Sequence, residues 1–341
     1  MSRHTLAINN KTAKGLDMKN ILLTTTALTL AIASMNSWAN EQTDWPNSMT
    51  VGTASQGGTY YIYGSGWANL VNQKLDTRIG AEITGGPVQN ISMVQMGEHD
   101  FGMVTMGPAV DALEGNSELL PDNTHADVRA MFPMYQTALH IVSLENSDIE
   151  SVADLDGKRV GVGPAGGTND EYHPRLFEAL GYDVETLQGG ASDQAGQLQD
   201  NLIDAFAFGA GMPIASFSQL EAQADVNIFS YSEEEIEHIL EEFPALSHSV
   251  VPGGTYNSVD EDIPTVSLWN FAITHKDMPD TLVYEIVDTI MSNHEQMLQV
   301  HGAAAETLPE NISYNNSIPF HPGAVKWFEE NGYDIPEDLK G

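Results

Sequence analysis

Short apolar segments rich in β-branched residues alternate along this chain with longer segments in which apolar residues recur every three or four positions. The first pattern is typical of buried strands and the second of amphipathic helices. We predict strands over 49–52, 78–84, 101–105, 128–135, 138–144, 158–163, 184–188, 205–208, 226–230 and 266–274. We predict helices over 62–75, 88–96, 169–180, 192–199, 278–300 and 322–331. Further helices are expected to start at 107–108, to end at 223, and to begin with a capping box formed by Ser232 and Glu235. This alternation favours an α/β fold with mainly parallel strand pairing.

Glycine-bearing turns join a strand to a helix at four places, residues 57–58, 85–87, 165–168 and 209–213. Ligands of open α/β sheets bind outside the carboxyl ends of the strands, where such turns lie. The helix that follows a turn begins with amides that lack intrahelical partners and with the positive end of its dipole. Two lobes facing each other would bring four such helix ends to one cleft suited to an anion, although each glycine pair could also be a simple turn.

The N-terminal segment has the pattern of a secretory signal. A short basic start at 18–20 precedes an apolar run at 21–33, and Ser37 and Ala39 are the small residues of a cleavage site after Ala39. We therefore expect a cleaved signal peptide over 1–39 and a periplasmic protein, with a retained anchor as the less favoured alternative. The apolar run is too short for a comfortable membrane span, and we find no other candidate span. About 300 residues then remain, enough for two lobes with a core each.

The predicted mature chain is strongly acidic. Residues 1–39 hold four of the 13 basic and one of the 48 acidic residues, which leaves 9 against 47 and a formal net charge of −38. Repulsion on this scale is relieved by salt, so we interpret it as adaptation to a saline medium. Such a polyanion does not bind nucleic acid or insert directly into an anionic bilayer through its general surface. The absence of cysteine excludes disulfides, thiolate metal ligands and thiol catalysis.

The sequence offers no recognisable catalytic constellation. A Gly-x-Ser-x-Gly nucleophile turn and a His-Glu-x-x-His metal pair are both missing, and His294, Glu295 and His301 have the wrong spacing for the latter. Residues 154–157 begin like a calcium loop but lack its later ligands. We therefore predict a protein without catalytic residues, metal or cofactor. A periplasmic enzyme stays the disfavoured alternative.

Several short motifs occur in an order that resembles the TAXI family of periplasmic solute-binding proteins, which serve TRAP transporters. They are 57–61 (GGTYY), 84–90 (TGGPVQN), 97–98 (GE), 154–160 (DLDGKRV), 204–208 (DAFAF), 254–256 (GTY) and 262–266 (DIPTV). The resemblance implies a type II periplasmic-binding-protein fold, with two α/β lobes joined by a hinge. Lobe 1 would comprise 47–137 plus 264–341, and lobe 2 would comprise 138–263.

The same resemblance implies a function. The protein would capture a small organic anion, a dicarboxylate or an acidic amino acid such as glutamate or 2-oxoglutarate. It would deliver this anion, as a monomer, to a TRAP-type membrane permease driven by an ion gradient. A receptor of the same fold that serves an ABC importer or a sensor kinase is the alternative. The chain departs from the family where Pro87 replaces a serine and where a Ser-Gly-Thr run is replaced by Gly166, Gly167 and Thr168, so hydroxyl donors near the ligand are lost.

We expect the ligand to contact residues of the four turns and of the helices that follow them. Two of these could instead bond locally, since Asn90 lies in a first helical turn and Thr168 could cap its own helix. We expect Arg159 and Arg175 to form surface ion pairs and predict no arginine clamp on the ligand. The predicted ligand-binding residues are Gly57, Gly58, Thr59, Tyr60, Asn90, Ala165, Gly166, Gly167, Thr168, Gly209 and Pro213.

Overall fold

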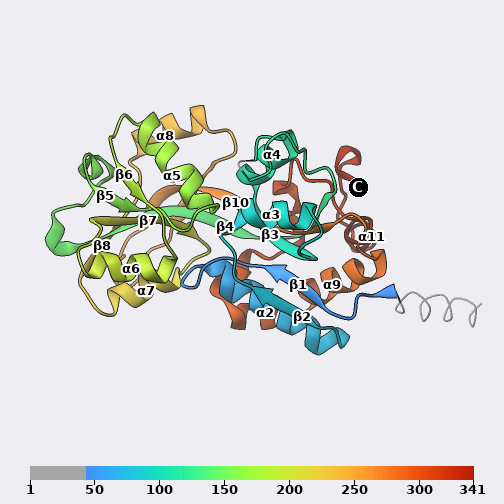
Figure 1. Ribbon diagram of the computed structural model, residues 1–341. Coiled ribbons are helices and arrows are strands. Elements are labelled where there is room, and N and C mark those ends of the chain that lie inside the picture. Colours follow the sequence, from blue (N-terminus) through green and yellow to red (C-terminus); the bar gives the residue numbers. More distant parts are fainter. Residues whose placement is uncertain (1–43, 118) are drawn as a thin grey trace, which may run out of the picture. The chain divides into compact units, whose positions relative to one another are not determined.

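Two long antiparallel strands, β4 (Val128–Leu144) and β10 (Ile263–His275), run through the centre of a ten-stranded sheet (Figure 1). The computed structural model describes residues 44–117 and 119–341, so the predicted signal peptide lies outside the described residues. The strand order is β2-β1-β3-β10-β4-β7-β5-β6, with β8 paired to β4 and β9 paired to β10. Both long strands are almost wholly buried.

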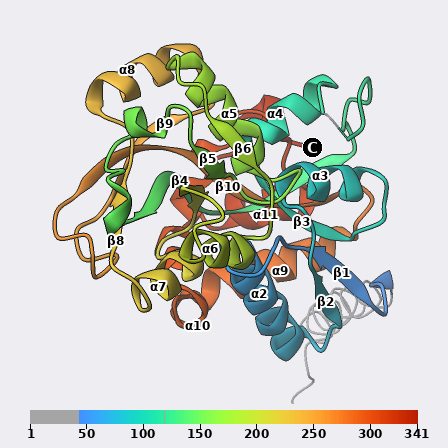
Figure 2. The same ribbon diagram turned by 60° about the vertical axis from the view of Figure 1, so that its left-hand side comes forward.

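One group of elements surrounds the β3 side of this pair. Strands β1 (Met49–Gly52), β2 (Ile79–Glu82) and β3 (Phe101–Thr105) are parallel to one another, and β3 is antiparallel to β10. Helices α3 and α4 cover one face, and α2 and α9 cover the other (Figures 1 and 2). The helices are α2 (Thr59–Leu75), α3 (Pro87–Gln95), α4 (Met106–Glu114), α9 (Asp280–Ser292), α10 (His294–Val300) and α11 (Pro322–Glu330).

A second group surrounds the β7 side. Helices α5 and α8 lie on one face of its strands, and α6 and α7 on the other (Figures 1 and 2). The strands are β5 (Arg159–Gly161), β6 (Glu185–Leu187), β7 (Ala205–Ala210), β8 (Val226–Phe229) and β9 (Ser247–Val251). The helices are α5 (Thr168–Ala179), α6 (Ala191–Gln199), α7 (Ala215–Glu221) and α8 (Glu233–Glu242). Short 3-10 helices lie at Glu145–Ser147, Val152–Leu155, Gly302–Glu306, Pro309–Tyr314 and Glu337–Leu339.

Aromatic side chains form much of the core in each group. Trp67 of α2 is fully buried and packs edge-on against Phe101 and Phe132, with ring centroids 5.7 and 6.0 Å apart. In the second group Phe217 packs against Phe206 at 5.5 Å. Burial of such rings contributes about 1.5–3 kcal/mol each before the entropy cost of ordering them. The sheet is therefore packed tightly on both sides of the β4–β10 pair.

The α/β class predicted from the sequence is confirmed, but the prediction of mainly parallel pairing is wrong. Four strand pairs are parallel and five are antiparallel. Every antiparallel pair involves β4 or β10. Periodicity within a strand does not reveal the direction of the neighbouring strand. Here the two long strands β4 and β10 run antiparallel to their neighbours, so antiparallel pairs outnumber parallel ones.

Two element boundaries also differ from the prediction. The strands predicted at 128–135 and 138–144 are one continuous strand of 17 residues. The helix predicted over 278–300 is interrupted at Asn293, whose side chain donates to the carbonyl oxygen of Thr289 at 2.7 Å. An asparagine that bonds to the backbone of its own helix competes with the helical pattern. The lobe boundaries at 137/138 and 263/264 stay predictions.

The predicted capping box and the predicted surface ion pairs of Arg159 and Arg175 are confirmed. Ser232 and Glu235 form the capping box at the start of α8. Arg159 forms a two-pronged ion pair with Asp204, at 2.8 and 3.0 Å. Arg175 pairs with Glu171 one turn earlier on α5, at 3.4 Å. No helix among residues 44–117 and 119–341 is long and apolar enough to cross a bilayer.

Buried histidines should make stability depend on pH. His140 is fully buried, its Nε2 lies 2.9 Å from the Tyr256 hydroxyl, and burial lowers its pKa to about 4. Below pH 6.5 the unfolded chain takes up a proton there and the folded protein does not. The free energy of unfolding should therefore fall from pH 6.5 towards pH 4, by about 1.4 kcal/mol per pH unit for this group.

Urea unfolding at pH 7, 6 and 5 measures this slope. The His140→Gln variant should show a shallower slope than the wild type, because the titrating group has been removed. His248→Gln, at an exposed position of β9, is the control. An equal change of slope in both variants would contradict the assignment to His140.

Candidate functional site

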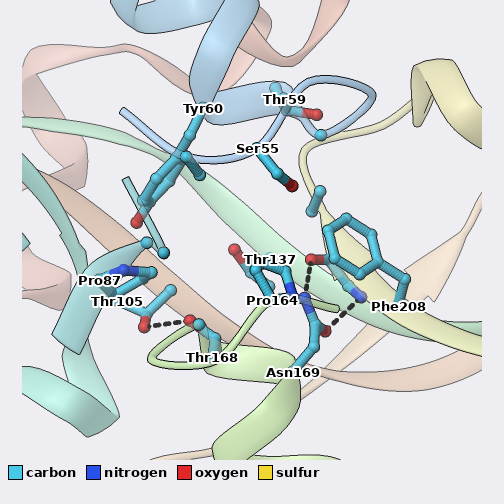
Figure 3. Close-up of a pocket in the computed structure, with 17 residues that line it drawn as sticks. Ser55, Thr59, Tyr60, Pro87, Thr105, Thr137, Pro164, Thr168, Asn169 and Phe208 are labelled. Atoms are coloured by element: carbon cyan, nitrogen blue, oxygen red, sulfur yellow. Dashed lines mark hydrogen bonds between the residues drawn. The ribbon is translucent and has the colours of Figure 1, made fainter. Parts of the chain in front are cut away.

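A small cavity lies where the two groups of elements face each other across β4 and β10 (Figure 3). Its volume is about 40 Å³. Residues from both groups line it, and they come mostly from the ends of strands and the starts of helices. The lining residues are Ala54, Ser55, Gly58, Thr59, Tyr60, Gly85, Gly86, Pro87, Thr105, Thr137, Pro164, Gly167, Thr168, Asn169, Phe208, Gly209 and Ala210.

Four helices begin at this cavity, because Thr59, Pro87 and Thr168 are the first residues of α2, α3 and α5, and Thr105 immediately precedes α4. None of the four has a side-chain cap. Glycine precedes α2, α3 and α5 and offers no side chain to accept the first amides. The positive ends of four helix dipoles therefore converge on one small space.

The hydroxyl that could cap α4 is engaged elsewhere. Thr105 Oγ1 lies 2.7 Å from Thr168 Oγ1, which joins the start of α4 to the start of α5 (Figure 3). The amide of Val88, at the start of α3, donates to the carbonyl oxygen of Gly166 at 3.1 Å. Unpartnered donors therefore remain mainly in the first turns of α2 and α5, where Thr59, Tyr60, Thr168 and Asn169 begin their helices.

The cavity wall carries no charged side chain among the described residues that line it. Its one acidic or basic group is Tyr60, whose pKa burial raises well above the usual value, so its hydroxyl is neutral. Arg159 and Arg175 do not line the cavity. No cluster of three or more His, Asp or Glu side chains that could hold a metal ion occurs in the described part of the chain. Any negative charge bound here would be stabilised by backbone dipoles and neutral donors.

Several hydrogen bonds hold the two groups of elements together around the cavity. Thr59 Oγ1 donates to the carbonyl oxygen of Gly211 at 2.5 Å. The amides of Ser192 and Ser216, at the starts of α6 and α7, donate to the carbonyl oxygens of Gln56 and Gly57 at 3.2 and 3.1 Å. These contacts close the cavity on the side of the 55–57 turn.

Asn270 of β10 connects the cavity to the two long strands. The Tyr60 hydroxyl donates to Asn270 Oδ1 at 2.6 Å, and Thr137 Oγ1 lies 3.2 Å from the same oxygen. Asn270 Nδ2 donates to the carbonyl oxygen of Tyr135 on β4 at 2.6 Å. The pairing of β10 with β4 shifts register between Trp269 and Phe271, on either side of this asparagine. Tyr60 and Thr137, which line the cavity, therefore bond to the residue at which the pairing of β10 with β4 is irregular.

The structure brings six of the eleven predicted site residues to the cavity. They are Gly58, Thr59, Tyr60, Gly167, Thr168 and Gly209. They lie at three of the four predicted turns, and the fourth turn, 85–87, contributes its glycines and Pro87. Ligand contact by each residue stays a prediction, but their common location agrees with the expected meeting of strand-to-helix turns.

Five predicted residues lie outside the cavity: Gly57, Asn90, Ala165, Gly166 and Pro213. Asn90 is fully buried, and its side chain bonds to Thr53, Met103 and Thr84 at 2.7–3.0 Å. This geometry favours bonding within the protein over ligand contact for Asn90, but its amide partners Thr53 and Met103 belong to other segments and not to its own helical turn.

The other four lie near the cavity but do not line it. The carbonyl oxygen of Gly57 accepts from Ser216, and that of Gly166 accepts from Val88. Ala165 and Pro213 are exposed. The 165–167 turn packs so closely against the 85–87 turn that a Cβ at position 85 would clash with the carbonyl oxygen of Ala165.

Sequence reasoning missed several lining residues, among them Ser55, Thr105, Asn169 and Phe208. Asn169 makes a two-way bond with Gly209, accepting from its amide at 2.5 Å and donating to its carbonyl oxygen at 3.0 Å (Figure 3). Phe208 forms an apolar wall beside Gly58, whose would-be Cβ would lie 3.4 Å from the ring. Phe208 and Thr105 lie at or near the carboxyl ends of buried strands, and that position was the available signal.

Solved structures show the same fold. MatC from Rhodopseudomonas palustris, with bound malate, aligns with a TM-score of 0.56 and 11% identity, over 79% of this chain and 92% of its own. The periplasmic binding protein BugD aligns with a TM-score of 0.54 and 14% identity, over 84% and 97%. A substrate-binding protein of an ABC uptake transporter from Streptococcus pneumoniae, with bound histidine, aligns with a TM-score of 0.50 and 14% identity, over 81% and 98%.

These likenesses confirm the predicted two-lobe fold of periplasmic binding proteins. They are too low in sequence identity to transfer a ligand. At the level of sequence, residues 51–332 match the model of the NMT1-like family, which covers nearly all of the chain that the structure describes. Because this match covers most of the sequence, the chain belongs to the NMT1-like family.

Proposed function

We propose that this protein is an extracytoplasmic solute receptor that captures a small organic anion between its two lobes and delivers it to a membrane permease. The observation that carries the proposal is the convergence of four uncapped helix N-termini on one cavity without charged side chains. Oriented amides and helix dipoles bind anions without a cationic side chain. The malate bound to MatC, one of the structural relatives, supports an organic acid as ligand.

Each lobe supplies some of the hydrogen-bond donors for the ligand, and this division explains how the ligand is captured. The first turn of α2 offers the amides of Thr59 and Tyr60, and the first turn of α5 offers those of Thr168 and Asn169. An anion between them satisfies both sets only when the lobes are closed. Ligand therefore shifts the population towards the closed form, whose surface the permease recognises.

The acidity of the protein does not prevent this binding. The formal net charge of the whole chain is −35, but no carboxylate occurs among the described residues that line the cavity. Salt screens charges beyond about 8–10 Å at physiological ionic strength, whereas the amides act at contact distance. The local potential of the helix ends thus outweighs the distant carboxylates in a saline medium.

The resemblance in sequence favours a TRAP-type permease driven by an ion gradient, and a dicarboxylate or an acidic amino acid as the anion. A receptor for an ABC importer is the second candidate, and the ABC uptake protein among the structural relatives favours it. Reconstitution with each kind of permease in proteoliposomes separates the two. Uptake that needs an ion gradient but no ATP supports the first candidate.

A valine at Gly58 should abolish binding while the protein stays folded. Gly58 has φ −94° and ψ 161°, which valine adopts readily, and its side chain would enter the cavity beside Phe208. A thermal-shift panel of organic anions in high salt selects the ligand, and a thousandfold excess over Kd should stabilise the wild type by about 4 kcal/mol. Calorimetry should then detect no binding by Gly58→Val.

The matched control is Gly196→Val. Gly196 is an exposed residue of α6 with no neighbouring atom within 4 Å of a would-be Cβ. This variant should bind as the wild type does. Unchanged affinity in Gly58→Val would reject the cavity as the binding site.

Loss of the hydrogen bond between the Thr105 and Thr168 hydroxyls, which joins the start of α4 to the start of α5, should weaken closure of the two lobes. Thr168→Val keeps the side-chain shape but removes the 2.7 Å contact with Thr105. We expect Kd to rise about five- to tenfold, since a hydrogen bond of this kind contributes about 1 kcal/mol. Thr289→Val, at a buried position of α9, is the control and should leave Kd unchanged. Equal affinities of Thr168→Val and the wild type would show that the pair does not stabilise the closed form.

A further inference from the structure

The cavity has donors for one negative charge but no partner for a second charge. Most of its polar side chains already bond to the protein, whereas Ser55 Oγ accepts from the amide of Ala191 at 3.2 Å and keeps its own O–H as a donor. Tyr60 and Thr137 bond to Asn270, and Asn169 bonds at both ends to Gly209. Thr59 donates to Gly211, and Thr105 bonds to Thr168. The donors left for a ligand are therefore mainly the unpartnered amides at the starts of α2 and α5, with the Ser55 hydroxyl as a further neutral donor.

An ammonium group would be unstable in this cavity. The described lining residues include no Asp or Glu, and the helix ends that face it are positive. A buried charge without a partner costs several kcal/mol. An α-amino acid would have to place its ammonium group in this environment.

A second carboxylate would also lack a partner, because the first one occupies the free amides of α2 and α5 and the described residues around the cavity include no Arg, Lys or His that could take its place. The remaining walls are apolar. Phe208, Pro87 and Pro164 face the space (Figure 3), and Ala54 and Ala210 also line it. These walls suit a short hydrocarbon or carbonyl end of a ligand.

The volume limits the size of this ligand. One water needs about 10–15 Å³ of such space, so a cavity of about 40 Å³ holds roughly three waters. Phe208 sets this size limit, because its ring lies against both Gly58 and Gly163. A Cβ atom added to Gly58 would lie 3.4 Å from the ring, and one added to Gly163 would lie 2.8 Å from it. A cavity of this size favours a ligand of two or three carbons over a five-carbon dicarboxylate.

We propose that the ligand is a monocarboxylate of two or three carbons without an ammonium group, such as acetate, propionate or pyruvate. Its carboxylate lies at the first turns of α2 and α5, and its other end contacts Phe208 and the two prolines. This inference rests on the proposed function and narrows it, since it excludes the dicarboxylates and acidic amino acids that the sequence resemblance favours.

Calorimetry with matched ligands tests the proposal in high salt. Propionate is compared with succinate, which adds a carboxylate, and pyruvate is compared with L-alanine, which replaces the keto group by an ammonium group. L-glutamate and 2-oxoglutarate complete the set. We expect propionate or pyruvate to bind at least 100-fold more tightly than succinate, L-alanine and L-glutamate.

Two failures are distinguishable. If succinate, 2-oxoglutarate or L-glutamate binds as tightly as the monocarboxylates, this inference is overturned while the proposed receptor function stands. If none of the anions binds to the folded protein, both are overturned.

A variant tests the role of the cavity wall. Phe208→Ala should raise the affinity for hexanoate relative to propionate at least tenfold, because the ring that limits chain length is gone. Phe177→Ala removes another buried ring, on α5, that does not line the cavity, and it should leave this ratio unchanged. If Phe208→Ala does not fold, Phe208→Leu tests the same ratio with a smaller change. An unchanged ratio in a folded Phe208 variant overturns the assignment of the apolar end.

Discussion

The antiparallel pairing of β4 with β10 is the interaction on which the rest of the structure depends. These strands pair from Val128 to Ala138 on one side and from Ser267 to His275 on the other. Beyond that stretch β4 pairs with β7 and β8, while β10 pairs with β3 and β9. One continuous sheet thus carries both groups of elements, and the carboxyl ends of the strands in each group face the same cavity. Without this pairing the four helix N-termini would not meet.

Glycine makes the meeting of the two lobes possible at the turns. Gly86 has φ +123°, a conformation that other residues rarely adopt, and its would-be Cβ would lie 3.2 Å from Gly167. Backbones therefore touch directly where side chains would hold the lobes apart. The same glycines leave the following helices without side-chain caps. The lack of a side chain at these positions therefore explains both the close approach of the backbones and the unsatisfied helix amides. Under the proposed function, the ligand would supply the acceptors that these amides lack.

Electrostatics and size act in the same direction at this site. Buried backbone donors can stabilise one anionic group at contact distance, even in a chain with 48 acidic and 13 basic residues. They offer nothing to a cationic group, and the neutral walls offer nothing to a second anion. Selectivity in such a cavity comes from the absence of partners for unwanted charges as much as from the donors present.

The sequence by itself determined the alternation of strands and helices, the α/β class and the four glycine turns, because these depend on local periodicity and backbone freedom. It also predicted Gly58, Thr59, Tyr60, Gly167, Thr168 and Gly209 as ligand contacts; all six line the cavity, and their contact with a ligand stays a prediction. Strand direction, the unbroken course of β4 and the roles of Phe208, Asn169 and Asn270 were decided only by the tertiary structure, since each depends on partners more than 20 residues away. Asn90 shows the same limit, because the sequence left open whether its side chain contacts the ligand or bonds locally. Its contacts with Thr53 and Met103 exist only once β1 and β3 pair.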